Sequence, residues 1–144
     1  MKRVLVVCLG NICRSPIGEE MLRMHAKKNN LPLFVESAGT SGWHQGNPPD
    51  PRSREVMKRH GHNIDDQRSR PLTAPDLQTF DYILAMDSQN LDDINTLQPG
   101  RAIVERFVPN TNVPDPYYGD GDGFERVYEM IDHAAKSWIS RWSL

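Results

Sequence analysis

The sequence predicts an α/β fold in which helices cover both faces of a four-stranded parallel sheet. Short apolar runs rich in β-branched residues alternate along the 144 residues with segments of helical spacing, an order typical of a doubly wound parallel sheet. The first run, over residues 3–8, is apolar without alternation, as expected for a strand that is covered on both faces. The length fits one domain over residues 1–144, and we find no repeat or linker that divides it.

The first half of the chain predicts two strand and helix pairs. Ser15 as N-cap and Pro16 at the first helical position begin a helix that we expect to reach residue 28. A second strand is predicted over 34–38, followed by a long Gly-, Pro- and Asn-rich loop over 39–51. A helix capped by Asp50 then runs to about residue 60. A loop of this length in a small domain usually binds something.

The second half continues the alternation. Strands are predicted over 80–86 and 103–108, with a helix over 88–97 between them. The last helix has apolar residues at spacings of three and four from 124 to 142, typical of a helix that packs on a core. Asp122 and Glu125 are placed as a capping box after a turn over 119–123. Together these elements predict a flavodoxin-like three-layer sandwich, with a ligand site at the carboxyl end of the first strand.

Composition excludes several classes of partner. The formal net charge is -2, and 25% of residues are charged, so no imbalance indicates binding to nucleic acid or to an anionic membrane. The apolar run after Met1 is too short for a signal peptide, and no stretch approaches the roughly 18 apolar residues of a membrane span. Two nearby cysteines suit neither a secreted disulfide scaffold nor a four-ligand zinc site. We therefore expect a cytoplasmic protein with reduced thiols.

Residues 8–15 join the first strand to the first helix and contain a Cys-X5-Arg pattern. Successive N–H groups above a helix N-terminus form an anion-binding nest, because unpaired donors and the positive end of the helix dipole point at one spot. Gly10 permits a positive φ and Asn11 tolerates the left-handed region, so the loop can curl. Arg14 adds a planar fork for two oxygens. The loop is predicted to bind phosphate or another oxyanion.

The same positive field favours the thiolate form of Cys8 at neutral pH, and the Ser15 hydroxyl can stabilise this anion further. Alone, a cysteine at a strand end is more often a small buried residue, and an arginine in a first helical turn is more often solvated. Here cysteine, glycine, asparagine, arginine, serine and proline converge at fixed spacing. The pattern therefore favours a nucleophilic thiol inside an oxyanion site.

The string Val-Cys-Leu-Gly-Asn-Ile-Cys-Arg-Ser-Pro over residues 7–16 resembles the signature loop that low-molecular-weight protein tyrosine phosphatases carry near the N-terminus. The resemblance spans nearly the whole chain, through residues 37–40, 43, 49–52, 80–81, 86–87 and 115–119. It implies an enzyme that hydrolyses phosphotyrosine esters through a phosphocysteine on Cys8, without a metal or organic cofactor.

The resemblance also implies roles for individual residues. Arg14 binds phosphate and stabilises the transition state, and Asp115 is the general acid that protonates the leaving phenolate and then activates water. Without the resemblance, Asp115 and Pro116 would indicate only a turn. Trp43 and Tyr117 match positions that line the family's substrate cleft, although a loop tryptophan could equally cap the core. The other loop residues implied to bind phosphate are Leu9, Gly10, Asn11, Ile12, Cys13 and Ser15.

Three further positions bear on the loop. Cys13 resembles the family's second loop cysteine, which can pair reversibly with the nucleophile and protect it from overoxidation; simple packing is the alternative. Gln67 stands where many members have a histidine that supports the loop asparagine, and glutamine can donate the same hydrogen bond without carrying a charge. Asp87 matches an acidic position near the loop and is expected to be structural.

Other functions remain open at this point. An arsenate reductase of the same fold would relay a disulfide through further cysteines, and none follows Cys13. A protein-arginine phosphatase tends to have threonine where this loop has Ile12, and a phosphotyrosine-binding module or a phosphate relay would not need Asp115. The expected partner is a tyrosine-phosphorylated protein, bound by a monomer that can self-associate weakly.

Overall fold

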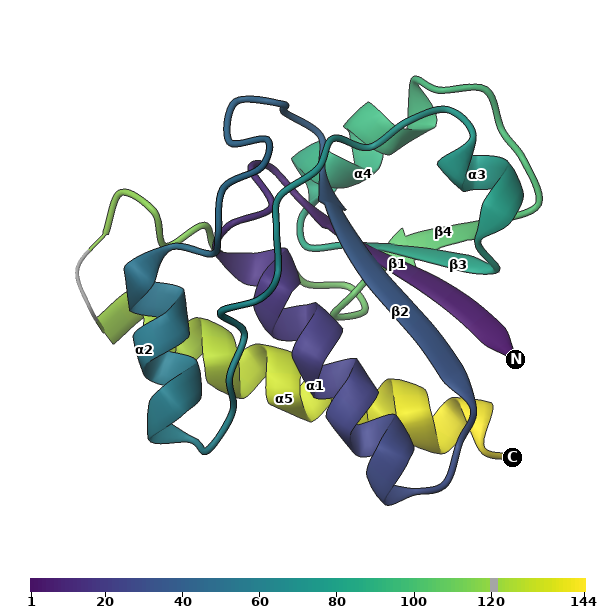
Figure 1. Cartoon of the computed structure of the whole chain (residues 1–144). Coiled ribbons are helices and arrows are strands. Elements are labelled where there is room, and N and C mark those ends of the chain that lie inside the picture. The colour runs from purple at the N-terminus through teal and green to yellow at the C-terminus, as the bar shows by residue number, and fades with distance from the viewer. Residues whose placement is uncertain (120–121) are drawn as a thin grey trace.

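A four-stranded parallel sheet in the order β2-β1-β3-β4 forms the centre of the structure, a computed structural model that describes residues 1–119 and 122–144 (Figure 1). The strands are β1 (Lys2–Cys8), β2 (Leu33–Gly39), β3 (Tyr82–Ala85) and β4 (Ile103–Arg106). The chain passes from β1 to one neighbour and later to the other, so the direction of winding reverses beside β1. In such sheets ligands bind at the carboxyl ends of the strands where the order reverses.

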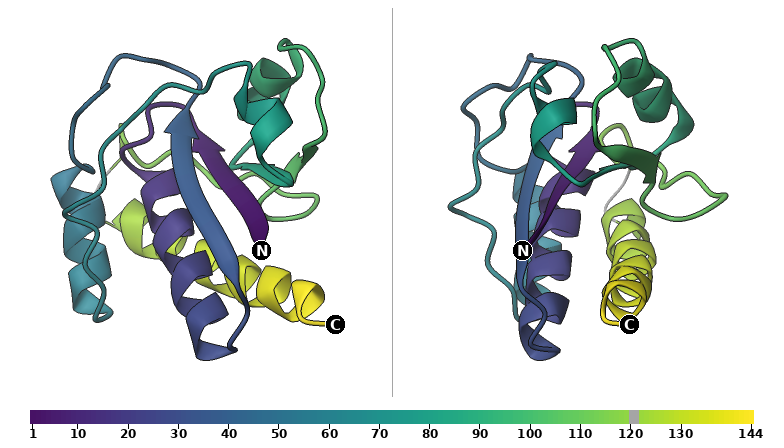
Figure 2. Two further views of the ribbon diagram at one scale, coloured as in Figure 1. Left: turned by 45° about the vertical axis from the view of Figure 1, so that its right-hand side comes forward. Right: turned by 90° about the vertical axis from the view of Figure 1, so that its right-hand side faces the viewer.

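Helices cover both faces of this sheet, which confirms the predicted fold class. The helices are α1 (Arg14–Lys28), α2 (Pro51–Arg59), α3 (Asp76–Thr79), α4 (Ser88–Asn95) and α5 (Asp122–Trp142). α1 and α5 pack on one face with α2 beside them, and α3 and α4 lie on the other face (Figure 2). Within the described residues, no helix is long and apolar enough to cross a membrane.

The apolar run of β1 is buried on both faces because its successive side chains point to opposite sides of the sheet. Val4 and Val6 join the core under α1 and α5, whereas Leu5 and Val7 join the core under α3 and α4. All four side chains are fully buried. This double burial explains why the run shows no alternation of apolar and polar residues.

The last helix packs as its spacing predicts. Its apolar residues are buried along one side, and Trp142 is partly buried at the end. The Trp138 indole N–H donates a hydrogen bond of 2.7 Å to the carbonyl of Phe107, which ties α5 to the end of β4. α5 begins at Asp122, the residue predicted as its cap, and the predicted turn over 119–123 includes residues 120 and 121, which lie outside the described residues. Glu125 contacts His60 at 2.7 Å.

Some predicted boundaries differ from the structure, and one helix was missed. β3 and β4 are shorter than the predicted runs over 80–86 and 103–108, because strand pairing ends while the apolar sequence continues into the core. The short helix α3 was not predicted, since four residues are too few to show a helical period. α1 begins at Arg14 rather than after Ser15, and Cys13 occupies the cap position.

Candidate active site

The 8–15 loop curls over the N-terminus of α1 at the carboxyl end of β1. Asn11 has a φ of 58°, the left-handed conformation that its residue type predicts. Gly10 does not use the positive φ that its residue type permits. Instead it allows a close approach, because a Cβ at Gly10 would lie 2.9 Å from Cδ2 of His44. Gly39 lies equally close beneath the loop, where a Cβ would be 2.8 Å from the carbonyl oxygen of Leu9.

The shift of the helix start changes what Ser15 does. Because Cys13 occupies the cap position, the Ser15 side chain caps nothing, and its hydroxyl lies 3.0 Å from Cys8 Sγ. No side chain of the described residues caps this helix, so its first N–H groups are free for a ligand. Asn11 Nδ2 donates to Ser15 Oγ at 2.7 Å, which leaves the Ser15 proton for the sulfur. The expected contact between Ser15 and Cys8 is therefore present, but the predicted cap is wrong.

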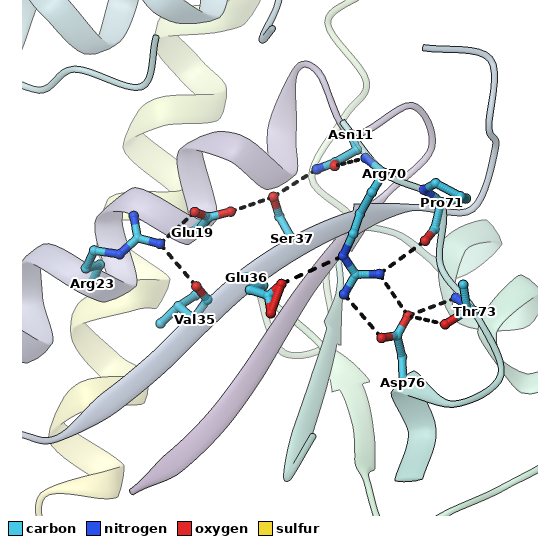
Figure 3. A network of polar contacts seen from close by, with 10 residues as sticks. All are labelled: Asn11, Glu19, Arg23, Val35, Glu36, Ser37, Arg70, Pro71, Thr73 and Asp76. Carbon is cyan, nitrogen blue, oxygen red and sulfur yellow. Dashed lines mark hydrogen bonds and ion pairs between the residues drawn. The ribbon is translucent and has the colours of Figure 1, made fainter. Parts of the chain in front are cut away.

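Asn11 is held from three sides. Its Nδ2 also donates to Ser37 Oγ at 2.9 Å, and its Oδ1 accepts from the backbone N–H of Arg70 at 3.1 Å. The Ser37 hydroxyl donates to Glu19 at 2.7 Å, so the oxygen of Ser37 is left to accept from Asn11 (Figure 3). Asn11 is buried, and these partners determine the orientation of its amide.

The position of Gln67 in the sequence predicted a hydrogen bond that supports Asn11, but Gln67 does not make this bond. Its Nε2 donates to the carbonyl of Pro16 at 3.0 Å, and its Oε1 is buried without a partner among the described residues. The hydrogen bond that was predicted from Gln67 is thus directed to the first turn of α1. Asn11 is held instead by the side chain of Ser37, which lies in the matched residues 37–40, and by the backbone of Arg70, which the sequence did not single out.

Arg14 is almost completely buried, with 1% of its surface exposed. Its Nη1 donates to Asp87 at 2.6 Å and to the carbonyl of Val113 at 2.9 Å, whereas its Nε has no partner among the described residues. Burial disfavours the charged guanidinium, but the negative charges of Cys8, Asp87 and Asp115 outweigh burial and raise the pKa of Arg14. Arg14 therefore stays charged and retains a free donor for an oxyanion.

Asp87 has two contacts that orient it. Besides pairing with Arg14, its other oxygen accepts from the backbone N–H of Asn90 and caps α4. This arrangement agrees with the structural role expected for Asp87, because the carboxylate holds one edge of the guanidinium in place.

Asp115 approaches the same guanidinium from the loop after β4. Its Oδ2 lies 3.6 Å from Arg14 Nη2, and its Oδ1 accepts from the backbone N–H of Tyr117 at 3.1 Å. The carboxyl side chain is 30% exposed. The fold therefore brings together the thiol, the arginine and the carboxyl group that the sequence singled out.

These groups line a cavity of about 180 Å³. The predicted residues that line it are Cys8, Leu9, Gly10, Ile12, Cys13, Arg14, Trp43, Asp115 and Tyr117. The side chains of Asn11 and Ser15 do not line it; both are buried behind the loop. Ser41, His44 and Tyr118 also line the cavity but were not predicted, although two of them flank Trp43 in the loop that was expected to bind something.

Trp43 and Tyr117 differ in how firmly they are held. Trp43 is 81% exposed, so it is a wall of the cavity and does not cap the core. Tyr117 is partly buried and packs against the core, with its ring centroid 6.1 Å from that of His44 and 4.9 Å from that of Tyr118. Aromatic rings from two separate loops thus line the cavity, which suits a flat aromatic group.

Cys13 lines the cavity and forms no disulfide with Cys8. The Ser53 hydroxyl donates to its carbonyl at 3.0 Å, which joins the loop to α2. Burial, together with the negative charge of Cys8, raises the pKa of the Cys13 thiol far above its usual range. Cys13 therefore stays protonated at neutral pH. In residues 1–119 and 122–144, no three His, Cys, Asp or Glu side chains gather as a metal site would require.

Comparison with known proteins connects this geometry to one group of enzymes. The model of a family described as low molecular weight phosphotyrosine protein phosphatase matches residues 3–143. A protein of that name from Schizosaccharomyces pombe is 44% identical, with 90% of each chain covered. The crystal structure of YfkJ from Bacillus subtilis superimposes with a TM-score of 0.91 at 36% identity, covering 99% of this chain and 95% of that one. A Drosophila arginine phosphatase superimposes with a TM-score of 0.91 at 30% identity, covering 100% and 99%.

Proposed function

The chain belongs to the low molecular weight phosphotyrosine protein phosphatase family, which makes it a hydrolase, and on that premise we propose that it cleaves phosphotyrosine esters through a phosphocysteine on Cys8. The observation that supports this proposal is the convergence of Cys8, Arg14 and Asp115 on one cavity above the uncapped N-terminus of α1. A nucleophile, an oxyanion site and a proton donor are the groups that phosphoester cleavage needs.

In the first step the Cys8 thiolate attacks phosphorus, and the bond from phosphorus to the phenolic oxygen breaks. Asp115, protonated at this stage, gives its proton to the leaving oxygen, so that a neutral tyrosine departs. The loop N–H groups and Arg14 donate to the equatorial oxygens, where negative charge is spread in the transition state. The Ser15 hydroxyl, 3.0 Å from the sulfur, stabilises the thiolate before attack.

In the second step a water molecule attacks phosphorus and the bond from phosphorus to sulfur breaks. Asp115, now a carboxylate, takes a proton from this water, and the products are inorganic phosphate and the Cys8 thiolate. The same oxyanion site stabilises both transition states, because the phosphoryl group does not leave the loop.

Hydrolysis of a phosphotyrosine peptide by the purified, fully reduced protein tests the proposal. With a chelator present, we expect steady release of phosphate in proportion to enzyme. Tight binding of the peptide without phosphate release would contradict hydrolysis and favour a binding module. A single turnover that leaves phosphate on Cys8 would instead favour a phosphate relay.

Phosphoarginine is the substrate of the second candidate function, which the similarity to a Drosophila arginine phosphatase brings into consideration. Two features favour the phenyl ester: Ile12 is an apolar residue in the lining of the cavity, and Trp43 and Tyr117 can contact a ring. We expect a phosphotyrosine peptide to be cleaved with the higher kcat/KM when both are offered on the same peptide backbone. The reverse order would reassign the substrate and leave the chemistry on Cys8 unchanged.

We also propose that Cys13 protects Cys8 from oxidation. Peroxide converts the Cys8 thiolate to a sulfenic acid, and the Cys13 sulfur then displaces water to form a disulfide that a dithiol reduces. Both thiols are free and buried, and both line the same cavity.

We expect peroxide-treated parent protein to regain most of its activity with dithiothreitol, whereas Cys13→Ser should be inactivated irreversibly. In the variant no second sulfur stops Cys8 from proceeding to sulfinic acid. Activity recovered after a timed peroxide pulse measures the difference. Equal recovery in the parent and in Cys13→Ser would show that Cys13 only fills space.

A further inference from the structure

The 69–72 segment connects the loop after α2 to α3 and runs past the end of β2. The N–H of Gly39 donates to the carbonyl of Arg70 at 2.9 Å, and the N–H of Leu72 donates to the carbonyl of Gly39 at 2.7 Å. Ser69 reaches the 8–15 loop, because its hydroxyl donates to the carbonyl of Gly10 at 3.0 Å. The segment therefore lies against the 8–15 loop without lining the cavity.

Arg70 makes two separate sets of contacts in this segment, one through its backbone and one through its side chain. Its backbone N–H is the donor to Asn11 Oδ1, at 3.1 Å. Its guanidinium points away from Asn11 and forms a two-pronged contact with the carboxylate of Asp76, at 3.1 and 3.2 Å (Figure 3). Nη1 also donates to the carbonyl of Pro71 at 3.2 Å, and Nε lies 3.8 Å from Glu36 on β2.

Asp76 is itself fixed at the start of α3. Its side chain is only 10% exposed, and one oxygen accepts from the backbone N–H of Thr73 at 2.8 Å and from the Thr73 hydroxyl at 3.1 Å. A carboxylate held by several donors gives the guanidinium a defined place to bind. The planar fork of arginine suits such a carboxylate, whereas lysine offers only a point charge.

We propose that the ion pair between Arg70 and Asp76 is a positioning interaction for the active site. It holds the Arg70 backbone N–H where it donates to Asn11 Oδ1. The orientation of the Asn11 amide determines that Nδ2 donates to Ser15, and this leaves the Ser15 proton free for the Cys8 sulfur. Arg70 thus acts on the nucleophile through Asn11 and Ser15, without touching substrate. The inference rests on the proposed function, because it assigns a role in activating Cys8.

Three variants test this role: Arg70→Ala removes the guanidinium, Arg70→Lys keeps its charge but not its fork, and Asp76→Asn keeps the acceptor but not the charge. Arg68→Ala is the matched control, because Arg68 is an exposed arginine two positions away whose side-chain hydrogen bonds, within the described residues, go to the carbonyls of Asp65 and Gln67. All four are compared with the parent at a temperature where circular dichroism shows them folded.

We expect Arg70→Ala to lower kcat by about 10- to 100-fold with KM unchanged, because small displacements of catalytic groups have effects of this size. The rate at which iodoacetamide alkylates Cys8 at neutral pH should fall in parallel, because less of the sulfur is thiolate. To assign the alkylation to Cys8, every variant is built on Cys13→Ser for this measurement. Arg70→Lys and Asp76→Asn should fall between Arg70→Ala and the control.

A merely structural ion pair would lower the free energy of unfolding without changing kcat or the alkylation rate of the folded protein. If all three variants match Arg68→Ala in both measurements, the positioning role is wrong while the proposed function stands. If the parent does not hydrolyse phosphotyrosine, the proposed function fails, and the alkylation rates still report whether Arg70 acts on Cys8. Should Arg70→Ala not fold, Arg70→Lys and Asp76→Asn provide the same comparison.

Discussion

Replacing Cys8 with serine is expected to lower phosphotyrosine hydrolysis by about 10⁴-fold or more, because loss of a nucleophile removes the whole covalent route. A serine hydroxyl is not ionised at neutral pH, whereas the site around Cys8 is built to stabilise an anion: the Ser15 hydroxyl lies 3.0 Å away and Arg14 is charged and buried. The oxygen of serine fits where the larger sulfur was, so the fold and the oxyanion site should persist. Phosphate release from a phosphotyrosine peptide measures the loss.

The same variant separates binding from catalysis. Cys8→Ser should still bind phosphate or a phosphotyrosine peptide, because Arg14 and the loop N–H groups are unchanged, and calorimetry can measure this binding. Cys13→Ser is the matched control, since it changes the other buried thiol of the same cavity and should keep most of the activity under reducing conditions. Substantial turnover by Cys8→Ser, or acid-stable phosphate on another residue after rapid quenching, would place the nucleophile elsewhere.

Replacing Asp115 with asparagine is expected to lower kcat for a phosphotyrosine peptide by about 10²- to 10⁴-fold, the range typical of a positioned general acid. Asparagine keeps an oxygen that can accept from the Tyr117 N–H, and it has nearly the shape of aspartate, so the loop should not move. It cannot give up a proton to the phenolate oxygen. Steady-state hydrolysis measures the decrease.

Comparison of leaving groups provides an internal control for this variant. An aryl phosphate with an acidic phenol, such as p-nitrophenyl phosphate, needs little protonation of its leaving oxygen, so its first step should suffer much less than that of phosphotyrosine. Quenched-flow measurement of the initial burst of phenol isolates this step from hydrolysis of the phosphocysteine. An equal loss for both leaving groups would mean that Asp115 acts by holding Arg14, 3.6 Å away, and not as an acid.

Much of the fold could be predicted from the sequence, because its signals act between neighbours in the chain. The apolar run of β1 indicated a strand buried on both faces, and Val4 and Leu5 indeed enter different cores. The apolar spacing of the last helix predicted its buried side correctly. Asn11 adopts the left-handed conformation that an asparagine in a tight loop tolerates. The four residues of α3 show no such period and were missed.

The helix start and the side-chain contacts of the 8–15 loop depend on neighbours in space as well as on the local preferences of its residues. Ser15 and Pro16 have the pattern of a helix start, yet the helix begins at Arg14, and the Ser15 hydroxyl contacts Cys8 instead of capping the helix. Gly10 permits a positive φ but does not adopt one, and the absence of a Cβ there instead allows the close approach of His44. A residue type shows what a position allows, whereas the neighbours in space determine which of the allowed roles it takes.

By itself the sequence determined the order of the strands and of the helices other than α3, and the loop that joins β1 to α1, because periodicity, turn chemistry and the spacing of Cys8 and Arg14 are properties of contiguous residues. Only the tertiary structure decided what surrounds that loop. Winding the chain to both sides of β1 brings the carboxyl ends of distant strands together, and this places Asp115 beside Arg14 and the backbone of Arg70 on Asn11. No local pattern encodes such pairs, since their partners are neighbours only after the sheet has formed.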